Sequence, residues 1–290
     1  MTGRAATPVR GLALVEAWRS FRTAIGLGWA IESNWSDPFL FSIYTVAKPL
    51  AAAGILVVMF RVIVPGEAAT PFLQFMIVGT ALWNVVFGAL AGLVQSILED
   101  RERYRMMKYV VVTPSSLFPF LMGRSLARIL ISFIAVAVTL LVGVLFLGLE
   151  LDPNLGYLIP ASVLGLAVVM SLGFFMAGWC LQLRQEAWSY PEAIAGALYL
   201  VSGAIFPIDV LPAILHPVAL LSPTTWWLEA SRRGLLGHGS PGMLGDLSDG
   251  TVMLALAAST VVVIPLSLTL FGWFMRRARQ AGLLDMTTGS

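Results

Sequence analysis

Five stretches of this 290-residue chain are predominantly apolar over about 25 residues or more, which limits what it can fold into. A helix needs about 20 apolar residues to cross the hydrocarbon core of a bilayer, which is about 30 Å thick. Charged residues make up 12% of the chain, against about 25% in a soluble domain. These features predict an all-α integral membrane protein. The five expected spans are Phe39–Val64, Phe72–Leu98, Leu117–Gly148, Gly156–Leu183 and Thr251–Met275.

A sixth, shorter span is expected at Glu192–Phe206. This stretch is about 22 Å long as a helix, and Pro207 then interrupts it. It can just cross the membrane when it is extended back through the preceding Trp-Ser-Tyr. We therefore expect six transmembrane helices in one membrane domain spanning residues 1–290. Residues 1–36 would form an N-terminal segment, 37–275 the six-span bundle and 276–290 a cytoplasmic tail.

The N-terminal piece Gly11–Leu27 mixes apolar residues with Glu16, Arg19 and Arg22. This pattern is typical of a helix that lies along the membrane interface. A loosely ordered tail is the alternative. Because the piece lacks a long apolar run, we expect no cleaved signal peptide.

The distribution of positive charge predicts the orientation of the chain. The segments before the first span, between the second and third, between the fourth and fifth, and after the sixth hold 4, 6, 1 and 3 Lys and Arg residues, where the count of 6 includes Arg124 and Arg128 in the first turns of the third span. The opposite loops hold Arg232 and Arg233, with Arg61 near a span end. We therefore expect both termini, and the connection between the second and third spans, to face the cytoplasm.

That connection begins with Glu99–Lys108, "EDRERYRMMK", in which seven of ten residues are charged. We expect a short cytoplasmic helix, on which Tyr104, Met107 and Val111 form an apolar ridge because they follow helical spacing. Such a helix could be a docking element, or it could be a solvated connector that only enforces the orientation. Arg124 and Arg128, at the start of the third span, are interpreted as interfacial anchors, with substrate contact as the alternative.

The stretch between the fifth and sixth spans, Ser202–Leu236, contains prolines at every fifth or sixth position. Its short apolar helices cannot span a membrane, but they can enter it and return if their backbone groups are covered by protein. We expect re-entrant helices at the outer face. A surface-lying apolar loop is the alternative.

Two polar residues inside the expected spans are candidates for a translocation path: Lys48 and Asn84. Lys48 lies about 15 Å into the first span, where a charged side chain is costly and therefore a functional candidate. It could also extend to the inner interface. Asn84 could line the path or hydrogen-bond between helices.

No motif in the sequence indicates catalysis. The two lysines, Lys48 and Lys108, do not follow a Gly-rich loop, so there is no Walker A phosphate cradle. Neither G-x-S-x-G nor H-E-x-x-H occurs. With Cys180 as the single cysteine and two histidines, no cluster has the spacing of a metal site. We expect a non-enzymatic protein that binds no metal, so energy for transport must come from a partner or an ion gradient.

Two motifs resemble the ABC-2 type permeases, the membrane subunits of bacterial ABC exporters. The order S-G-x-x-F-P-x-x-x-L-P, a second Pro-initiated segment and a helix with a basic pair matches the outer segment of that family. The stretch "EDRERYRMMKYVVVTPSS" resembles the family's loop between spans two and three, and the likeness covers nearly the whole chain. The family loop usually has Gly and Thr after its charged cluster, where this chain has Tyr104 and Arg105.

The resemblance implies that the charged stretch is a coupling helix, which inserts into a groove on a separate ATP-binding subunit. The implied partners are two ABC ATP-binding subunits, which carry the ATP and Mg²⁺, a second copy of this chain, and membrane lipid; no cofactor on this chain and no nucleic acid are implied. The residues that would carry the coupling are Glu99, Arg101, Glu102, Arg103, Tyr104, Met107 and Lys108.

The outer segment would then form the outer gate of an exporter in the bacterial inner membrane. The implied cargo is amphiphilic, drug-like, lipid-linked or glycan. An ion-coupled carrier or a membrane-embedded scaffold without an ATPase partner is the alternative, and a membrane-embedded enzyme would need a polar cluster that the spans lack. The implied gate residues are Ser202, Gly203, Phe206, Pro207, Leu211 and Pro212.

Overall fold

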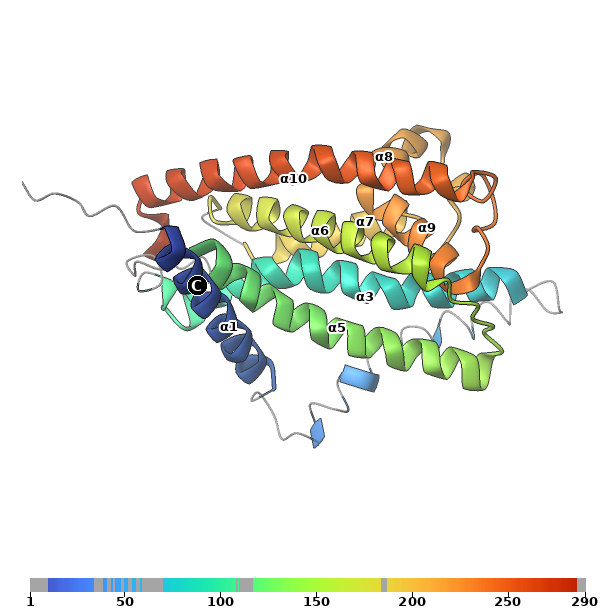
Figure 1. The fold of residues 1–290 in the computed structure, drawn as a ribbon, viewed down its shortest axis with the longest axis horizontal. Coiled ribbons are helices and arrows are strands. Elements are labelled where there is room, and N and C mark those ends of the chain that lie inside the picture. The colour runs from blue at the N-terminus through green and yellow to red at the C-terminus, as the bar shows by residue number, and fades with distance from the viewer. Residues whose placement is uncertain are drawn as a thin grey trace, which may run out of the picture.

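The computed structural model describes residues 10–33, 70–107, 117–183 and 187–285, together with position 109 and separate positions between 39 and 58. Within these residues all regular secondary structure is helical. The long helices run side by side, and short helices gather at one end of the bundle (Figure 1). The expected all-α architecture is therefore confirmed for the described part of the chain.

The central element is α3 (Thr70–Leu98), which lies between α5 and α6 in Figure 1. Its side chains are almost all buried, as at Val78, Val86 and Val94, so protein surrounds this helix on most of its faces. Small residues allow this close approach. A Cβ at Gly173 of α6 would lie 2.6 Å from the carbonyl oxygen of Ala89.

The bundle has three further long helices, of which α5 and α6 pack against α3 and α10 packs against α6, and all four are long and apolar enough to cross a membrane. Their bounds lie within five residues of the expected spans. At the start of α10, for example, Ser248 caps the helix by accepting a hydrogen bond from the backbone N–H of Thr251. The three helices are α5 (Leu117–Leu147), α6 (Leu155–Cys180) and α10 (Asp249–Gln280).

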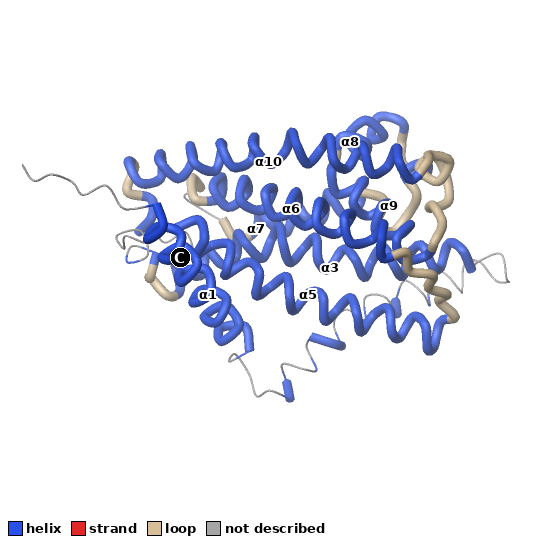
Figure 2. Tube along the Cα trace, in the orientation of Figure 1, coloured by secondary structure: helices blue, strands red, loops and turns tan. Residues whose placement is uncertain are grey.

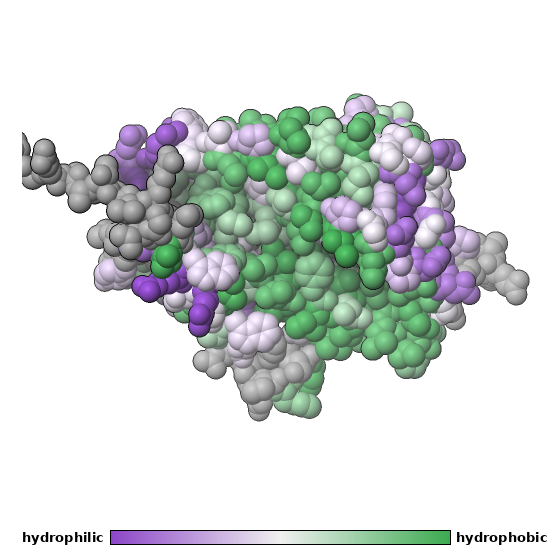
Figure 3. Space-filling model, in the orientation of Figure 1, coloured by the Kyte–Doolittle hydropathy of each residue, from purple (hydrophilic) through white to green (hydrophobic). Residues whose placement is uncertain are grey.

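Hydrophilic residues gather at the two ends of the bundle, and apolar residues lie between them (Figure 3). Large apolar side chains such as Phe146, Leu254 and Val261 are exposed along the outside of the long helices. Exposed apolar surface of this extent is typical of a protein whose solvent there is lipid.

The N-terminal helix α1 (Arg10–Ser33) crosses the start of α5 at an angle (Figure 1). Its close contact is made at Gly28, where a Cβ would lie 2.8 Å from the Cβ of Ala127. Trp18 and Trp29 of the same helix are exposed. The chain is thus helical here and not a loosely ordered tail, and the placement of this helix along the membrane interface stays a prediction.

After α6 the chain forms α7 (Ser189–Val201), which begins within the Trp-Ser-Tyr extension. With 13 residues it is about 20 Å long, which is shorter than a full span requires. Short helices follow it at one end of the bundle, as Figure 2 shows. They are η3 (Ile208–Val210), η4 (Ala213–Leu215), α8 (His216–Leu221) and α9 (Pro223–Leu236), and η5 (Leu283–Asp285) follows α10 at the other end.

The first expected span, Phe39–Val64, and its candidate residue Lys48 lie mostly outside the described residues. That span, the fifth span and the re-entrant helices therefore remain predictions.

Candidate functional site

The charged stretch begins where α3 ends. The helix passes without a break into η2 (Glu99–Arg103), a single π-helical turn in which Tyr104 N donates to Glu99 O over 2.9 Å. The chain then bends at Tyr104, and Arg105 has a φ of 50°, in the left-handed region, which residues other than glycine seldom adopt. The stretch is thus a π-helical turn followed by a bend, in place of one continuous helix from Glu99.

Two arginines of α5 hold the acidic residues of this turn. Arg124 Nη2 lies 3.1 Å from Asp100 Oδ1, and both side chains are fully buried. Arg128 Nη2 lies 2.8 Å from Glu99 Oε1. Buried charges require partners of this kind, because neither solvent nor lipid can stabilise them there. The interpretation of Arg124 and Arg128 as interfacial anchors is therefore wrong, since they join α5 to the charged turn.

Arg128 also contacts two further elements. Its Nη1 donates to Gln95 Oε1 of α3 over 2.6 Å, and its Nε lies 2.7 Å from Glu32 Oε1 of α1. On the other side of the turn, Trp188 Nε1 donates to Glu102 Oε2 over 2.7 Å. The turn is consequently fixed to α1, α3, α5 and the segment that precedes α7.

Some of the expected coupling residues are buried and others are exposed to solvent. Arg101 is ion-paired with Glu102, and Arg101 and Met107 are buried at 2% and 1% exposure, so Met107 faces the core rather than an apolar outer ridge. Arg103, Tyr104 and the neighbouring Arg105 are exposed. Glu99 and Glu102 are partly buried, and Lys108 lies outside the described residues.

At the other end of the bundle, the chain turns sharply after α7. Gly203 has a φ of 72°, which explains why a glycine stands at this position. Pro207 and Pro212 each precede a short 3-10 turn. Of the expected gate residues, Ser202, Gly203 and Leu211 are buried, Phe206 and Pro207 are partly buried, and Pro212 is exposed.

Arg232 of α9 holds this sharp turn in place. Its Nη2 donates to the carbonyl oxygens of Gly203 and Ala204 over 2.6 Å and 3.0 Å. Its Cζ lies 3.7 Å from the centre of the Phe75 ring of α3, a cation–π contact. Burial lowers the pKa of Arg232 to about 10, and Glu229 partly offsets this, so the guanidinium remains charged at neutral pH. Arg232 therefore joins α9, α3 and the turn after α7.

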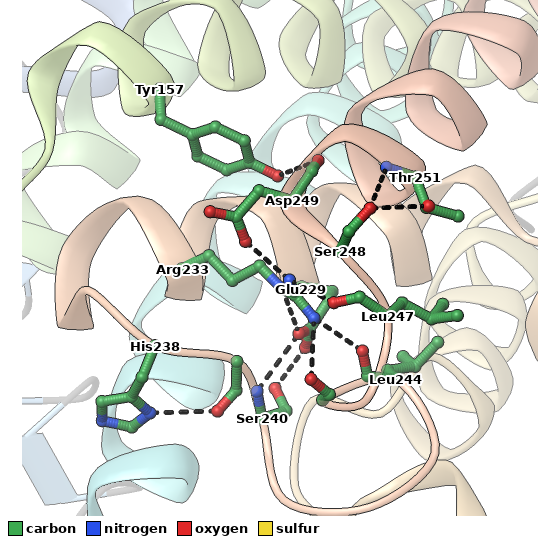
Figure 4. A network of polar contacts seen from close by, with 12 residues as sticks. Tyr157, Glu229, Arg233, His238, Ser240, Leu244, Leu247, Ser248, Asp249 and Thr251 are labelled. Carbon is green, nitrogen blue, oxygen red and sulfur yellow. Dashed lines mark hydrogen bonds and ion pairs between the residues drawn. The ribbon is translucent and has the colours of Figure 1, made fainter.

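The next arginine organises a separate polar network (Figure 4). Arg233 Nε donates to Glu229 Oε1 over 2.8 Å, and its Nη1 donates to Asp249 Oδ1 over 2.6 Å. Glu229 also accepts from the backbone N–H of Ser240 over 3.1 Å and from its hydroxyl. Burial opposes the charge of Arg233, but the hydrogen bonds that it donates to Glu229 and Asp249 outweigh this effect and raise its pKa. The loop before α10 is thereby attached to α9.

Four exposed apolar side chains line the short helices beyond this network: Val210, Ile214, Val218 and Leu221. The most exposed are Ile214 and Leu221, at 83% and 84%. Apolar exposure next to a buried polar network favours contact with lipid or with another protein over contact with water.

A comparison with known protein families matches a part of the chain that includes both ends of the bundle described above. The family model of the ABC-2 type transporters matches residues 27–236, which include the charged turn, the sharp turn after α7 and α9. The chain belongs to the ABC-2 type transporter family. It is also 28% identical over 165 residues to the ycf38 protein of Cyanophora paradoxa, which bears the name of a transport permease. That alignment covers 56% of this chain and 55% of the relative, so the chain spans about half of the relative's length.

Membership of the ABC-2 family and the four long apolar helices together indicate a multi-pass membrane protein. Permeases of this family are membrane subunits that do not themselves hydrolyse ATP, and they associate with ABC ATP-binding partners. Among the described residues, no group of three His, Cys, Asp or Glu side chains could hold a metal ion.

Several residues that organise these two ends of the ABC-2 chain were not singled out from the sequence. Glu32 and Trp188 each bond to a partner more than 80 positions away, so no local pattern indicates them. Glu229 and Arg233 follow the i,i+4 spacing of a helical ion pair, but the bonds of Glu229 to Ser240 join it to a different segment. The adjacent pair Arg232 and Arg233, on an otherwise weakly charged segment, was the one available signal. Asn84 donates to the carbonyl oxygens of Thr80 and Ala81 of its own helix over 3.0 Å and 3.3 Å, and its place on a translocation path remains a prediction.

Proposed function

We propose that this chain is the permease subunit of an ATP-driven exporter in the bacterial inner membrane, with both termini in the cytoplasm. It would work as a homodimer with two ATP-binding subunits. Membership of the ABC-2 family supports this proposal, and so does the rigidly held charged turn at the end of α3. In this arrangement the six-span bundle includes Phe39–Val64 and α7, with η3, η4 and α8 as re-entrant elements.

The charged turn has the properties expected of the contact through which an ATP-binding subunit would move the permease. Its base is fixed by the pairs Asp100–Arg124 and Glu99–Arg128, while Arg103, Tyr104 and Arg105 are exposed at its tip. Exposed charges give the association of two proteins its specificity and orientation, and a tyrosine can pack its apolar ring into a pocket of the partner. A push on this tip would be passed to α3 and α5 instead of being absorbed by a flexible loop. The buried Arg101 and Met107 would shape the turn from inside.

The outer gate would be the sharp turn after α7, held by Arg232. Since Arg232 also contacts Phe75 of α3, movement of α3 would reach the gate directly. The exposed apolar side chains of η3, η4 and α8 favour an amphiphilic, drug-like or lipid-linked cargo, or a glycan carried on a lipid, that leaves along the membrane.

The test is ATP hydrolysis by the complex of this chain with the ABC ATP-binding subunit that purifies with it. Arg103→Glu reverses a charge at the tip of the turn, and Arg279→Glu reverses one exposed on α10, near the same end of the bundle. We expect Arg103→Glu to reduce the hydrolysis stimulated by the permease at least tenfold, and Arg279→Glu to leave it within twofold.

Equal rates in the two variants, with both complexes intact, would refute the coupling role of the turn. Export itself is tested in inside-out vesicles that contain the complex. ATP should drive a fluorescent lipid-like substrate into the lumen, and accumulation that persists without ATP but follows an ion gradient would support the carrier alternative instead.

A further inference from the structure

A pocket of about 180 Å³ lies at the end of the bundle that carries α9, opposite the charged turn. Its walls come from the start of α3, the end of α9 and the loop that follows α9. Pro71, His238 and Pro241 are exposed, so the pocket opens at the surface. The residues that line it are Pro71, Phe75, Arg232, Leu236, His238, Gly239, Ser240 and Pro241.

Arg232 gives this pocket its chemistry. Among the lining residues it is the one with a permanent charge, and its side chain is almost entirely buried, at 2% exposure. Its Nη2 donates to two carbonyl oxygens, whereas its Nε has no hydrogen-bond partner. A buried donor left unpaired is unfavourable, commonly by about 1–3 kcal/mol. The guanidinium therefore has a buried donor that no protein group satisfies.

The carboxylates near the pocket do not neutralise Arg232 by direct pairing. Glu229 lies close enough to favour its charge, but Glu229 is paired with Arg233 and hydrogen-bonded by Ser240. Asp249 is likewise bound by Arg233. Carbonyl oxygens supply only partial negative charge to Arg232. No carboxylate lines the pocket itself, and Glu229 and Asp209 line a smaller adjoining pocket that shares Arg232 with it.

The size and surroundings of the pocket restrict the anion. Pockets for drug-sized ligands usually measure about 300–1,000 Å³, so this one suits a single small group. Guanidinium groups bind phosphate with particular geometric fit. The pocket also lies at the end of the bundle, where hydrophilic surface meets the apolar belt (Figure 3), and the phosphates of a bilayer lie at such a boundary.

We propose that this pocket binds a phosphate group, presented either by an anionic lipid headgroup or as free inorganic phosphate. Arg232 is the binding residue, Phe75 and Leu236 form the apolar walls, and His238 stands at the mouth. Because Arg232 also holds the turn after α7, an occupied pocket would stabilise that turn. The inference concerns binding alone and does not depend on ATP-driven export.

The test is isothermal titration of the 290-residue chain in detergent at constant ionic strength. One arm uses inorganic phosphate, and the other uses a short-chain phosphatidylglycerol below its micelle concentration. We expect saturable binding of one equivalent in at least one arm. Arg232→Gln should weaken it about tenfold to a hundredfold, as expected for the loss of a charged hydrogen bond, while Arg279→Gln should bind as the unaltered chain does.

Binding in the phosphate arm identifies the free anion as ligand, and binding in the lipid arm alone identifies the headgroup. A second variant, His238→Trp, covers the mouth from an exposed position and leaves Arg232 in place, so it keeps the test decisive if Arg232→Gln fails to fold. It should also weaken binding at least tenfold. Absence of saturable binding in both arms, or unchanged affinity in His238→Trp, would overturn the proposal.

Discussion

At the scale of single residues, Arg128 joins three separate elements of the fold, which no pattern in the sequence indicated. One guanidinium contacts Glu32 of α1, Gln95 of α3 and Glu99 of the charged turn. Its side chain is 13% exposed, so these partners replace most of the water around the charge. We conclude that Arg128 fixes the turn relative to the helices behind it.

Replacement of Arg128 should therefore destabilise the protein. Arg128→Gln removes both ion pairs and leaves Glu32 and Glu99 with fewer partners, so we expect a loss of about 2–3 kcal/mol in the free energy of unfolding. Thermal denaturation in detergent measures the effect. Arg276→Gln, at an exposed position of α10, should remain within about 0.5 kcal/mol, and equal stability of the two variants would contradict this assignment.

The sequence showed that charges cluster at Glu99–Lys108, but it could not show their partners. Asp100 and Arg124 are 24 positions apart, and their pairing depends on the rotation of two helices about their axes. The same limit applies to Arg232, whose acceptors are backbone oxygens that become available only because the chain turns at Gly203. The positive φ of Arg105 falls at the Tyr104–Arg105 departure from the family pattern.

At the scale of elements, the packing of α1 on α5 depends on small residues at the crossing. A Cβ at Gly123 would lie 2.5 Å from the carbonyl oxygen of Phe21, and one at Gly28 would lie 3.3 Å from the carbonyl oxygen of Arg124. The Cβ at Gly28 would also lie 2.8 Å from the Cβ of Ala127, so a larger side chain at either position requires the helices to shift. The close approach is also what brings Glu32 to Arg128.

Gly28→Leu should consequently detach α1 from α5, whereas Gly26→Leu should not, because a Cβ at Gly26 meets no atom within 4 Å. We expect Gly28→Leu to lower the melting temperature and to make α1 sensitive to trypsin, which cuts after its arginines. Limited proteolysis of the two variants measures this directly. Similar digestion rates for both would show that the crossing is not stabilising.

The sequence predicted the positions of the long helices better than those of the short and irregular elements. Long apolar runs located α3, α5, α6 and α10, because a membrane-spanning helix needs a length of apolar sequence that few other structures use. The run at Glu192–Phe206 was ambiguous, since Pro207 and Gly203 interrupt it, and α7 ends at Val201. The π-helical turn at Glu99–Arg103 had no sequence signal, and its acidic residues pair with arginines that follow more than 20 positions later.

At the scale of the whole molecule, α3 connects the two candidate functional ends. Phe75 contacts Arg232 near the outer turn, and Glu99 follows the other end of the helix. A separation of 24 residues corresponds to about 36 Å of helix. Because α3 is buried along most of its length, it can transmit a displacement between the ends only together with its neighbours α5 and α6.

The proposed topology places these ends on opposite sides of the membrane, which cysteine labelling can test. Cys180 is fully buried, so it gives little background. In intact cells, a membrane-impermeant maleimide should label His238→Cys and not Arg279→Cys, both of which are exposed positions. Both should react after lysis. Labelling of Arg279→Cys in intact cells would contradict the cytoplasmic placement of the C-terminal end.

The central claim is that the exposed tip of the charged turn is where an ATP-binding partner acts on this permease. A photo-crosslinking amino acid at Tyr104, which is 38% exposed, tests it most directly, with the same residue at the exposed Val210 of the opposite end as control. Irradiation of cells should join the Tyr104 variant, and not the Val210 variant, to an ABC ATP-binding subunit identified by mass spectrometry. Absence of that adduct at Tyr104, or equal adducts at both positions, would contradict the account.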